Sequence, residues 1–293
     1  MTHSRMIFCS FVALLVISTH GVAEGAQRKA APLVIGETFT IDSKILGETR
    51  RINVYLPPCY VDSRSLRLPV LYMPDGGIGE DFLHVAGLVQ VLVGNGTMRP
   101  FILVGIENTE RRRDLTGPTE NEEDKKIAPR VGGSAAFRAF IRRELMPQVK
   151  ARYRTTDETA IVGESLAGLF VVETLLKEPD LFDTYIAFDP SLWWNDQGLV
   201  NGAADDLRKR PKLSKTLYLA NSRDEMIPGT MQRFVDVLSK NAPPGLHWHY
   251  EKMPEENHAT IYHPAALKAF RAVFKPHEKA GRQAGASPGA GSR

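Results

Sequence analysis

The chain has 293 residues, of which 43% are hydrophobic and 24% are charged, and its formal net charge is +3. This length and composition are typical of one globular domain with a large core. The small net charge argues against a long basic surface, so we expect no nucleic-acid partner.

Residues 1–23 have the pattern of a secretory signal peptide. Arg5 precedes an apolar run from Met6 to Ser18, and the small residues Gly21 and Ala23 follow at the spacing that a signal peptidase accepts. The run is too short for an ordinary membrane span. We therefore expect cleavage after Ala23 and a protein that is exported, either to the periplasm or into the medium, with an uncleaved anchor as the alternative.

Removal of the signal peptide would leave Cys59 as the only cysteine, which excludes an internal disulfide. Cys59 follows two prolines in a predicted turn, and we expect a structural role for it. At the other end, residues 275–293 are rich in Gly, Ala and Ser and are predicted to form a disordered tail. The predicted folded domain is therefore residues 24–274.

Short apolar runs alternate with helical periodicity throughout this domain. Strands are predicted at 38–43, 51–56, 69–73, 101–106, 159–162, 185–188, 216–220 and 246–252, and helices at 82–93, 134–153, 166–177, 231–239 and 264–274. Buried strands that alternate with helices predict an α/β fold with a mostly parallel central sheet and helices on both faces. The long polar segment 107–133 is predicted to be a functional or disordered loop.

Ser165 lies in the segment GESLAG (163–168), between a predicted strand and a predicted helix. This arrangement is typical of the nucleophile elbow of α/β hydrolases, in which a strained turn lifts the serine oxygen above the sheet. The usual pattern is G-x-S-x-G, and here Ala167 takes the last position and is nearly as small. The alternative is a serine in an ordinary or phosphate-binding turn. We predict an α/β-hydrolase fold with Ser165 as nucleophile.

A serine nucleophile needs a base, and the base needs an acid to orient it. In this fold the acid and then the histidine follow the serine along the chain. The predicted strand 216–220 runs into Asp224 and Glu225, and His258 lies between the last strand and the last helix. We predict His258 as the base and Asp224 as the acid, with Glu225 as the alternative acid.

Other histidines fit these roles less well. His263 is the only rival base, and a capping or surface role is expected for it, whereas His84 precedes the serine. His247 and His249 flank a tryptophan on one strand without an evident third ligand, so we expect no zinc site. A partly solvated strand face is expected at these two histidines.

An ester hydrolase also needs N–H groups that bind the developing oxyanion. One candidate is the backbone N–H of Leu166, directly after the nucleophile. The second is expected in the glycine-rich turn after strand 69–73, where either Gly76 or Gly77 lets the main chain approach closely. A plain connecting turn is the alternative.

Together these motifs resemble the "putative esterase" family, which includes esterase D, the enterobactin and salmochelin esterases and the antigen 85 mycolyltransferases. The likeness is strongest to the esterase-D and siderophore-esterase branch, and it covers nearly the whole predicted domain in family order. The matching segments are LPVLYMPDGG (68–77), GIENTERRRDLTGP (105–118), GESLAGLF (163–170), DPSLWW (189–194) and NHATIYHPA (257–265).

The resemblance implies that Ser165 and His258 hydrolyse a carboxylic ester without a metal or a cofactor. It also implies that residues 111–114, with Arg111 and Arg113, and the pair Trp193 and Trp194 border the substrate pocket. Guanidinium groups can hold an anionic or catechol-bearing substrate, and tryptophans can form a flat apolar wall. A solvated charge run and core aromatics are the alternatives.

Two points depart from the family pattern. Asp189 replaces the first serine of the relatives' usual SPSLWW, which we expect to alter the polarity of the pocket. Some siderophore-esterase relatives use a Ser–His pair without an acid. The resemblance therefore leaves three possibilities open: Asp224 as the acid, Glu225 as the acid, or no acid at all.

The sequence therefore favours a serine esterase that acts through an acyl-enzyme on a small-molecule ester, with siderophore esters among the candidates. Two alternatives stay open at this point. One is an acyltransferase of the same fold, and the other is a catalytically silent binding protein with a hydrolase fold.

Overall fold

A computed structural model describes residues 30–276 of the chain. The chain divides into two units, residues 1–34 and 35–293. Of the first unit, residues 30–34 are described, and they have no regular secondary structure. The predicted signal peptide and its cleavage site lie outside the described residues, as does most of the predicted tail.

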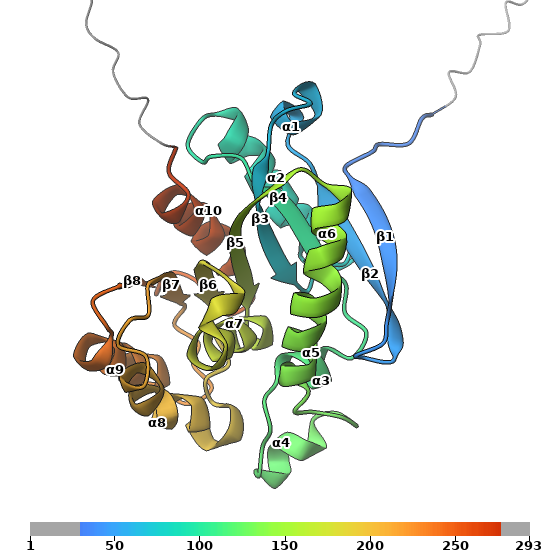
Figure 1. Cartoon of the computed structure of the whole chain (residues 1–293). Coiled ribbons are helices and arrows are strands. Elements are labelled where there is room, and N and C mark those ends of the chain that lie inside the picture. The colour runs from blue at the N-terminus through green and yellow to red at the C-terminus, as the bar shows by residue number, and fades with distance from the viewer. Residues whose placement is uncertain (1–29, 277–293) are drawn as a thin grey trace, which may run out of the picture. The chain divides into compact units, whose positions relative to one another are not determined.

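The second unit contains one eight-stranded sheet with the order β1-β2-β4-β3-β5-β6-β7-β8 (Figure 1). The strands are β1 (Glu37–Ser43), β2 (Glu48–Tyr55), β3 (Leu68–Pro74), β4 (Ile102–Ile106), β5 (Thr155–Glu164), β6 (Thr184–Phe188), β7 (Lys215–Asn221) and β8 (Leu246–Lys252). β1 and β2 pair antiparallel to their neighbours, and β3 to β8 are all parallel.

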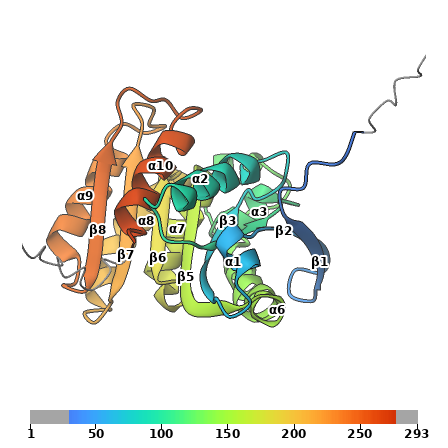
Figure 2. The same cartoon turned by 90° about the horizontal axis from the view of Figure 1, so that it is seen from above.

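Helices cover both faces of this sheet (Figure 2). α2 (Phe82–Gly94) and α10 (Tyr262–Val273) pack on one face. The other face is covered by α5 (Ser134–Phe140), η1 (Ile141–Leu145), α6 (Met146–Arg152), α7 (Leu166–Lys177), α8 (Trp194–Arg208) and α9 (Thr230–Asn241). Shorter elements are α1 (Pro58–Asp62), α3 (Arg111–Leu115), α4 (Glu122–Lys126) and η2 (Pro179–Leu181). The predicted α/β architecture with a mostly parallel sheet is confirmed.

Differences from the sequence-based expectation occur where apolar periodicity is weak. α8 was not predicted, because it is rich in Asn, Asp and Gly, and its buried residues are few (Trp194, Val200, Ala203 and Leu207). The segment 107–133, predicted as a loop, contains α3 and α4. The buried Asp124 holds this segment in place, because it accepts hydrogen bonds from the hydroxyl of Thr119 and the backbone N–H of Asn195.

Among the described helices, we find none with the length and apolar character needed to cross a membrane.

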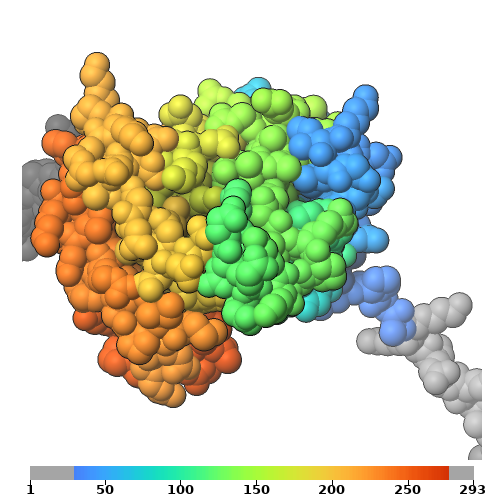
Figure 3. All heavy atoms as spheres, turned by 90° about the horizontal axis from the view of Figure 1, so that it is seen from below, coloured from blue at the N-terminus to red at the C-terminus, as the bar shows by residue number. Residues whose placement is uncertain are grey.

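The arrangement of the parallel strands positions the site. β5, β6, β7 and β8 are neighbours in the sheet, and their carboxyl ends meet at one edge, where binding sites of parallel sheets form. Figure 3 shows this face of the molecule, on which residues of the segment 107–133 (green) lie beside residues that follow β6 and β7 (yellow and orange).

Candidate active site

Ser165 forms a sharp turn between β5 and α7. Its backbone angles are φ 61° and ψ −121°, a strained conformation for a residue other than glycine. Small neighbours make this turn possible: a Cβ atom on Gly163 would lie 2.7 Å from the carbonyl carbon of Ala167, and one on Gly168 would lie 2.9 Å from the carbonyl oxygen of Phe188. The local geometry is therefore that of the predicted elbow.

His258 meets this serine from the loop between β8 and α10. Its Nε2 atom lies 3.1 Å from the Oγ atom of Ser165, within hydrogen-bonding distance. In the neutral ring with the proton on Nδ1, Nε2 accepts the serine hydroxyl proton. The rival base His263 packs instead against His84, with 5.5 Å between the ring centroids.

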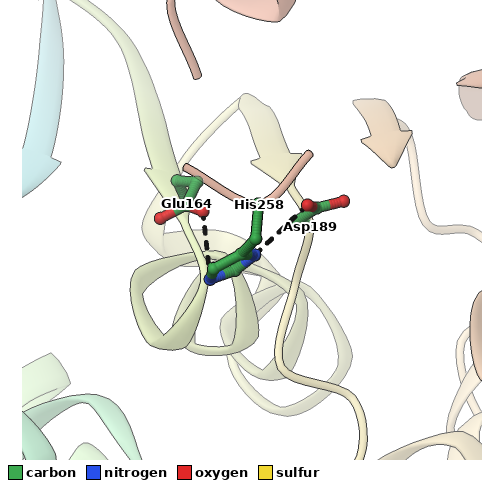
Figure 4. A group of neighbouring side chains, drawn as sticks. All are labelled: Glu164, Asp189 and His258. Carbon is green, nitrogen blue, oxygen red and sulfur yellow. Dashed lines mark hydrogen bonds and ion pairs between the residues drawn. The ribbon is translucent and has the colours of Figure 1, made fainter. Parts of the chain in front are cut away.

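The carboxylate that contacts Nδ1 of His258 is that of Asp189, directly after β6. Its Oδ2 atom lies 3.2 Å from Nδ1 of the ring, as Figure 4 shows. The Asp189 side chain is only 3% exposed, and it accepts hydrogen bonds from the backbone N–H and the hydroxyl of Ser222, both at 2.6 Å. Its φ angle of 38° is also unusual for a residue other than glycine. Asp189 is therefore a fixed, buried acceptor behind the imidazole.

The prediction of Asp224 or Glu225 as the acid differs from this geometry. Asp224 accepts a hydrogen bond from the backbone N–H of His258 at 3.2 Å, and its side chain is 53% exposed. Glu225 accepts from the side chain of Asn221 and the backbone N–H of Gly229. Neither carboxylate contacts the imidazole, because Asp189 already occupies the Nδ1 side from the neighbouring strand.

Three carboxylates, those of Asp189, Glu164 and Asp224, raise the pKa of the His258 ring. The hydrogen bond to Asp189 raises the pKa of His258, and the nearby charge of Glu164 raises it further, against the opposing effect of burial. Glu164 is the last residue of β5, and its Oε1 atom lies 3.3 Å from Nε2 of His258. Burial raises the pKa of Glu164 from 4.5 to about 7. The sequence analysis assigned no role to Glu164.

Of the three predicted oxyanion donors, the backbone N–H of Leu166 lies at the cavity, and those of Gly76 and Gly77 donate to other groups. Leu166 lines the cavity and is the first residue of α7, where backbone N–H groups lack a partner within the helix. The N–H of Gly76 donates to the carbonyl of Ile106 at 3.0 Å, so it is part of the main-chain pairing. The N–H of Gly77 donates to the carboxylate of Glu80 at 2.6 Å. Both glycine N–H groups are thus engaged, contrary to the prediction of a free second donor.

A cavity of about 730 Å³ opens beside Ser165. Its walls come from three segments: 111–127, the residues after β6, and the residues after β7. The lining residues are Arg111, Arg112, Ile127, Ser165, Leu166, Asp189, Pro190, Ser191, Leu192, Trp193, Asn221, Arg223, Asp224, Glu225, Met226, Ile227, Thr230, Met231 and His258. The sequence analysis did not anticipate the apolar wall formed by Met226, Ile227 and Met231.

Of the four predicted substrate contacts, two line the cavity and two do not. Arg111 and Trp193 line it, although Arg111 also forms a two-point ion pair with Asp75 at 2.7 and 2.8 Å. Arg113 instead donates to the carboxylates of Glu48 and Asp114. The side chain of Trp194 is buried, and its Nε1 donates to the carbonyl of Gly117 at 2.9 Å. Trp194 is thus a core aromatic, as its alternative had it, whereas Arg113 is 12% exposed and held in ion pairs, so it neither lines the cavity nor belongs to a solvated charge run.

Within residues 30–276, one group of three potential metal ligands lies together: Glu164, Asp189 and His258. The two carboxylates contact different nitrogens of the ring, Nε2 and Nδ1. Lone pairs on these nitrogens point in divergent directions, so the three groups surround the imidazole rather than a common metal position.

A mostly parallel sheet with a serine elbow after β5 and a histidine after β8 defines an α/β hydrolase. The chain belongs to the "putative esterase" family, whose model matches residues 43–263. This finding confirms the predicted resemblance and the predicted α/β-hydrolase fold.

Curated relatives carry siderophore esterase names. The ferri-bacillibactin esterase BesA of Bacillus subtilis is 31% identical over 168 residues, which are 50% of this chain and 56% of that protein. The siderophore triacetylfusarinine C esterase of Aspergillus fumigatus is 30% identical over 192 residues, which are 61% of this chain and 63% of that protein. The matches thus span little more than half the length of these relatives.

A solved structure extends the likeness over most of the chain. The IroE-like serine hydrolase from Shewanella oneidensis superposes with a TM-score of 0.73 and 31% identity, covering 82% of this chain and 80% of that one. The siderophore hydrolase EstB from Aspergillus nidulans, with a TM-score of 0.70 and 20% identity over 85% of this chain and 97% of that one, shares the fold.

Proposed function

We propose that the protein is a serine carboxylic-ester hydrolase in which Ser165 is the nucleophile, His258 the base and Asp189 the acid. The observation that carries this proposal is the continuous line of contacts from Asp189 to Nδ1 of His258 at 3.2 Å and from Nε2 to Ser165 at 3.1 Å. A serine, a histidine and a buried carboxylate in this order are the arrangement that activates a hydroxyl group.

The reaction would proceed in two halves. His258 takes the hydroxyl proton while Oγ of Ser165 attacks the ester carbonyl, and the N–H of Leu166 stabilises the oxyanion. The protonated ring then gives its proton to the leaving alcohol, which leaves an acyl-enzyme on Ser165. Water attacks the acyl group in the second half, with His258 again as base, and frees the acid. Asp189 accepts from Nδ1 throughout and stabilises the imidazolium.

The proposed substrate is a small ester, with siderophore esters as the first class to test. Relatives named for such esters share the family, and the cavity of about 730 Å³ is large enough for a drug-sized ligand. Arg112 and Trp193 offer a cation and an aromatic surface at its wall. Export of the protein is part of the proposal and rests on the signal pattern of residues 1–23.

The test is an activity screen of purified protein on p-nitrophenyl esters and on iron-loaded siderophore esters, with Ser165→Ala beside the unmodified chain. The proposal expects loss of about 10⁴-fold or more in kcat for this variant, since the nucleophile is removed. A fluorophosphonate probe should label Ser165, as identified by mass spectrometry of the labelled peptide.

Ser191 provides a matched control, because its Oγ atom lies 3.5 Å from that of Ser165. The Ser191→Ala variant should still be labelled at position 165. Ester hydrolysis that survives Ser165→Ala, or a probe found on Ser191, would contradict the assignment.

A further inference from the structure

Glu164 is a partly buried carboxylate that the mechanism above does not use. It precedes Ser165 in the elbow, and its side chain is 15% exposed. Its Oε1 atom is buried and has no hydrogen-bond partner among the described residues. This Oε1 atom lies 3.3 Å from Nε2 of His258. Glu164 and Asp189 thus contact the two different nitrogens of one ring (Figure 4).

The interaction between the carboxylate of Glu164 and the ring of His258 becomes attractive during the proposed reaction. In the resting state Nε2 carries a lone pair that accepts the Ser165 hydroxyl, and an ionised carboxylate beside that lone pair gains nothing from it. When the serine proton has moved to Nε2, the same carboxylate faces a positive ring at 3.3 Å. An interaction that is stronger in the transition state than in the ground state accelerates the reaction.

We propose that Glu164 is a second carboxylate that acts on His258, from the side of the nucleophile, and stabilises the imidazolium formed when Ser165 loses its proton. The inference rests on the proposed esterase function and adds a positioning residue to it. Glu164 acts through the histidine and takes no proton from the substrate.

The groups that face Glu164 come from several elements. His258 and Asp189 lie at the site itself, Arg111 approaches from α3, and Asp81 lies before α2. Arg111 is already paired with a carboxylate other than Glu164. Among the described residues, His258 is therefore the one cation-forming group within ion-pair distance of Glu164, with 3.3 Å between Nε2 and Oε1. Burial raises the pKa of Glu164 to about 7, and a positive charge on His258 lowers it, so the protonated ring favours the ionised carboxylate.

The test compares Glu164→Gln with Glu255→Gln in the purified protein, using the pH profile of kcat/KM. Glu255 lies on the loop that carries His258, and its side chain is exposed, so its variant removes an equal charge without contact to the ring. In the Glu164 variant the acidic limb of the profile should move to lower pH by about one unit, because one anion that favours the protonated ring is gone. The plateau rate should fall about tenfold.

The sign of the limb shift separates this role from a structural one. A variant that merely distorts the elbow lowers the rate and leaves the limb in place. A limb that stays in place in a folded Glu164→Gln protein, or that moves to higher pH, would overturn the proposal. If the glutamine variant does not fold, Glu164→Asp withdraws the carboxylate from Nε2 and should move the limb in the same direction by a smaller amount.

A titration of His258 by NMR in the Ser165→Ala background tests the contact without any turnover. Introducing Glu164→Gln there should lower the pKa of the ring by about one unit. One outcome is that the pKa of the ring shifts in this background while the unmodified protein has no esterase activity. That result would refute the proposed function and leave the contact between Glu164 and His258 in place. Activity without the shift would refute the role of Glu164 alone.

Discussion

Replacement of Asp189 by Asn is the sharpest test of the site geometry. The amide oxygen of Asn can still accept the backbone N–H of Ser222, which leaves the amide N–H₂ facing Nδ1 of His258. An N–H donor at that position favours the ring tautomer with the proton on Nε2. This tautomer cannot accept the proton of Ser165, so the base is lost without any loss of packing volume.

The expected loss in kcat is about 10³- to 10⁴-fold, the size of effect that follows when a triad acid becomes an amide. A change in stability should accompany it, because the hydroxyl of Ser222 loses a charged acceptor at 2.6 Å. Loss of a hydrogen bond to a charged group corresponds to about 1.5–3 kcal/mol. Thermal unfolding of the variant measures this term separately from the rate.

Asp224→Asn is the control for this experiment. Its side chain is 53% exposed, forms a long ion pair with Arg223 at 4.0 Å and accepts the backbone N–H of His258, for which an amide oxygen is an adequate acceptor. Hydrolysis of p-nitrophenyl butyrate should fall at most about fivefold, since an exposed charge near the ring contributes about 1 kcal/mol or less. A nearly unchanged Asp189→Asn variant beside an inactive Asp224→Asn variant would refute our assignment of the acid.

Three further changes test the fold, two away from the site and one in the elbow itself. Hydrogen bonding to Arg113 lowers the pKa of Glu48 from 4.5 to about 2, so the ionised carboxylate stabilises the fold above about pH 4.5, and this stabilisation is lost as the pH falls toward 2. Urea midpoints at about pH 7 and about pH 3 should therefore differ less in Glu48→Gln than in the unmodified protein, and an equal difference would contradict this. Arg50→Ala should destabilise the protein by about 3–5 kcal/mol in urea unfolding, because Arg50 is fully buried and its carboxylate partners would remain; a loss near zero would show that the ion pair is dispensable. Gly163→Ala should destabilise the protein by about 1–3 kcal/mol, because its Cβ would lie 2.7 Å from the main chain of Ala167. The melting temperature and the activity should both fall. An unaffected melting curve would disprove the close contact.

Local patterns were sufficient to locate the elbow. Ser165 lies at a strand-to-helix junction with small residues on either side, and the helix predicted at 166–177 is α7 as observed. His258 followed from chain order, because a residue after the last strand of a parallel sheet must reach the same edge as a residue after β5. These inferences depend on sequence spacing and sheet topology, which a sequence can carry.

The acid depends on geometry that spacing does not carry. Asp189 and Asp224 both follow parallel neighbouring strands, one residue after β6 and three residues after β7. Either could reach the ring of His258 by topology alone. The choice is made by side-chain direction, which the unusual φ of 38° at Asp189 and its two bonds to Ser222 determine. The exchange of a serine for an aspartate in DPSLWW was the one available signal.

The substrate contacts were only half predictable for a similar reason. Arg111 and Arg113 belong to one short helix, yet Arg111 reaches the cavity and Arg113 turns toward Glu48. Residues two apart on a helix point about 200° apart, so Arg111 and Arg113 cannot both face one ligand. Trp193 and Trp194 diverge in the same way, and the second is part of the core.

The location of Asp189 also bears on how such an enzyme can be altered. Because the ring of His258 is held from the β6 side, the residues that follow Ser222 form a cavity wall with no contact to the imidazole itself. Met226 in that wall is 74% exposed, so its replacement disturbs little packing. In the proposed enzyme, variation there, by drift or in a directed library, would change which ester fits the cavity and leave the contacts among Ser165, His258 and Asp189 in place.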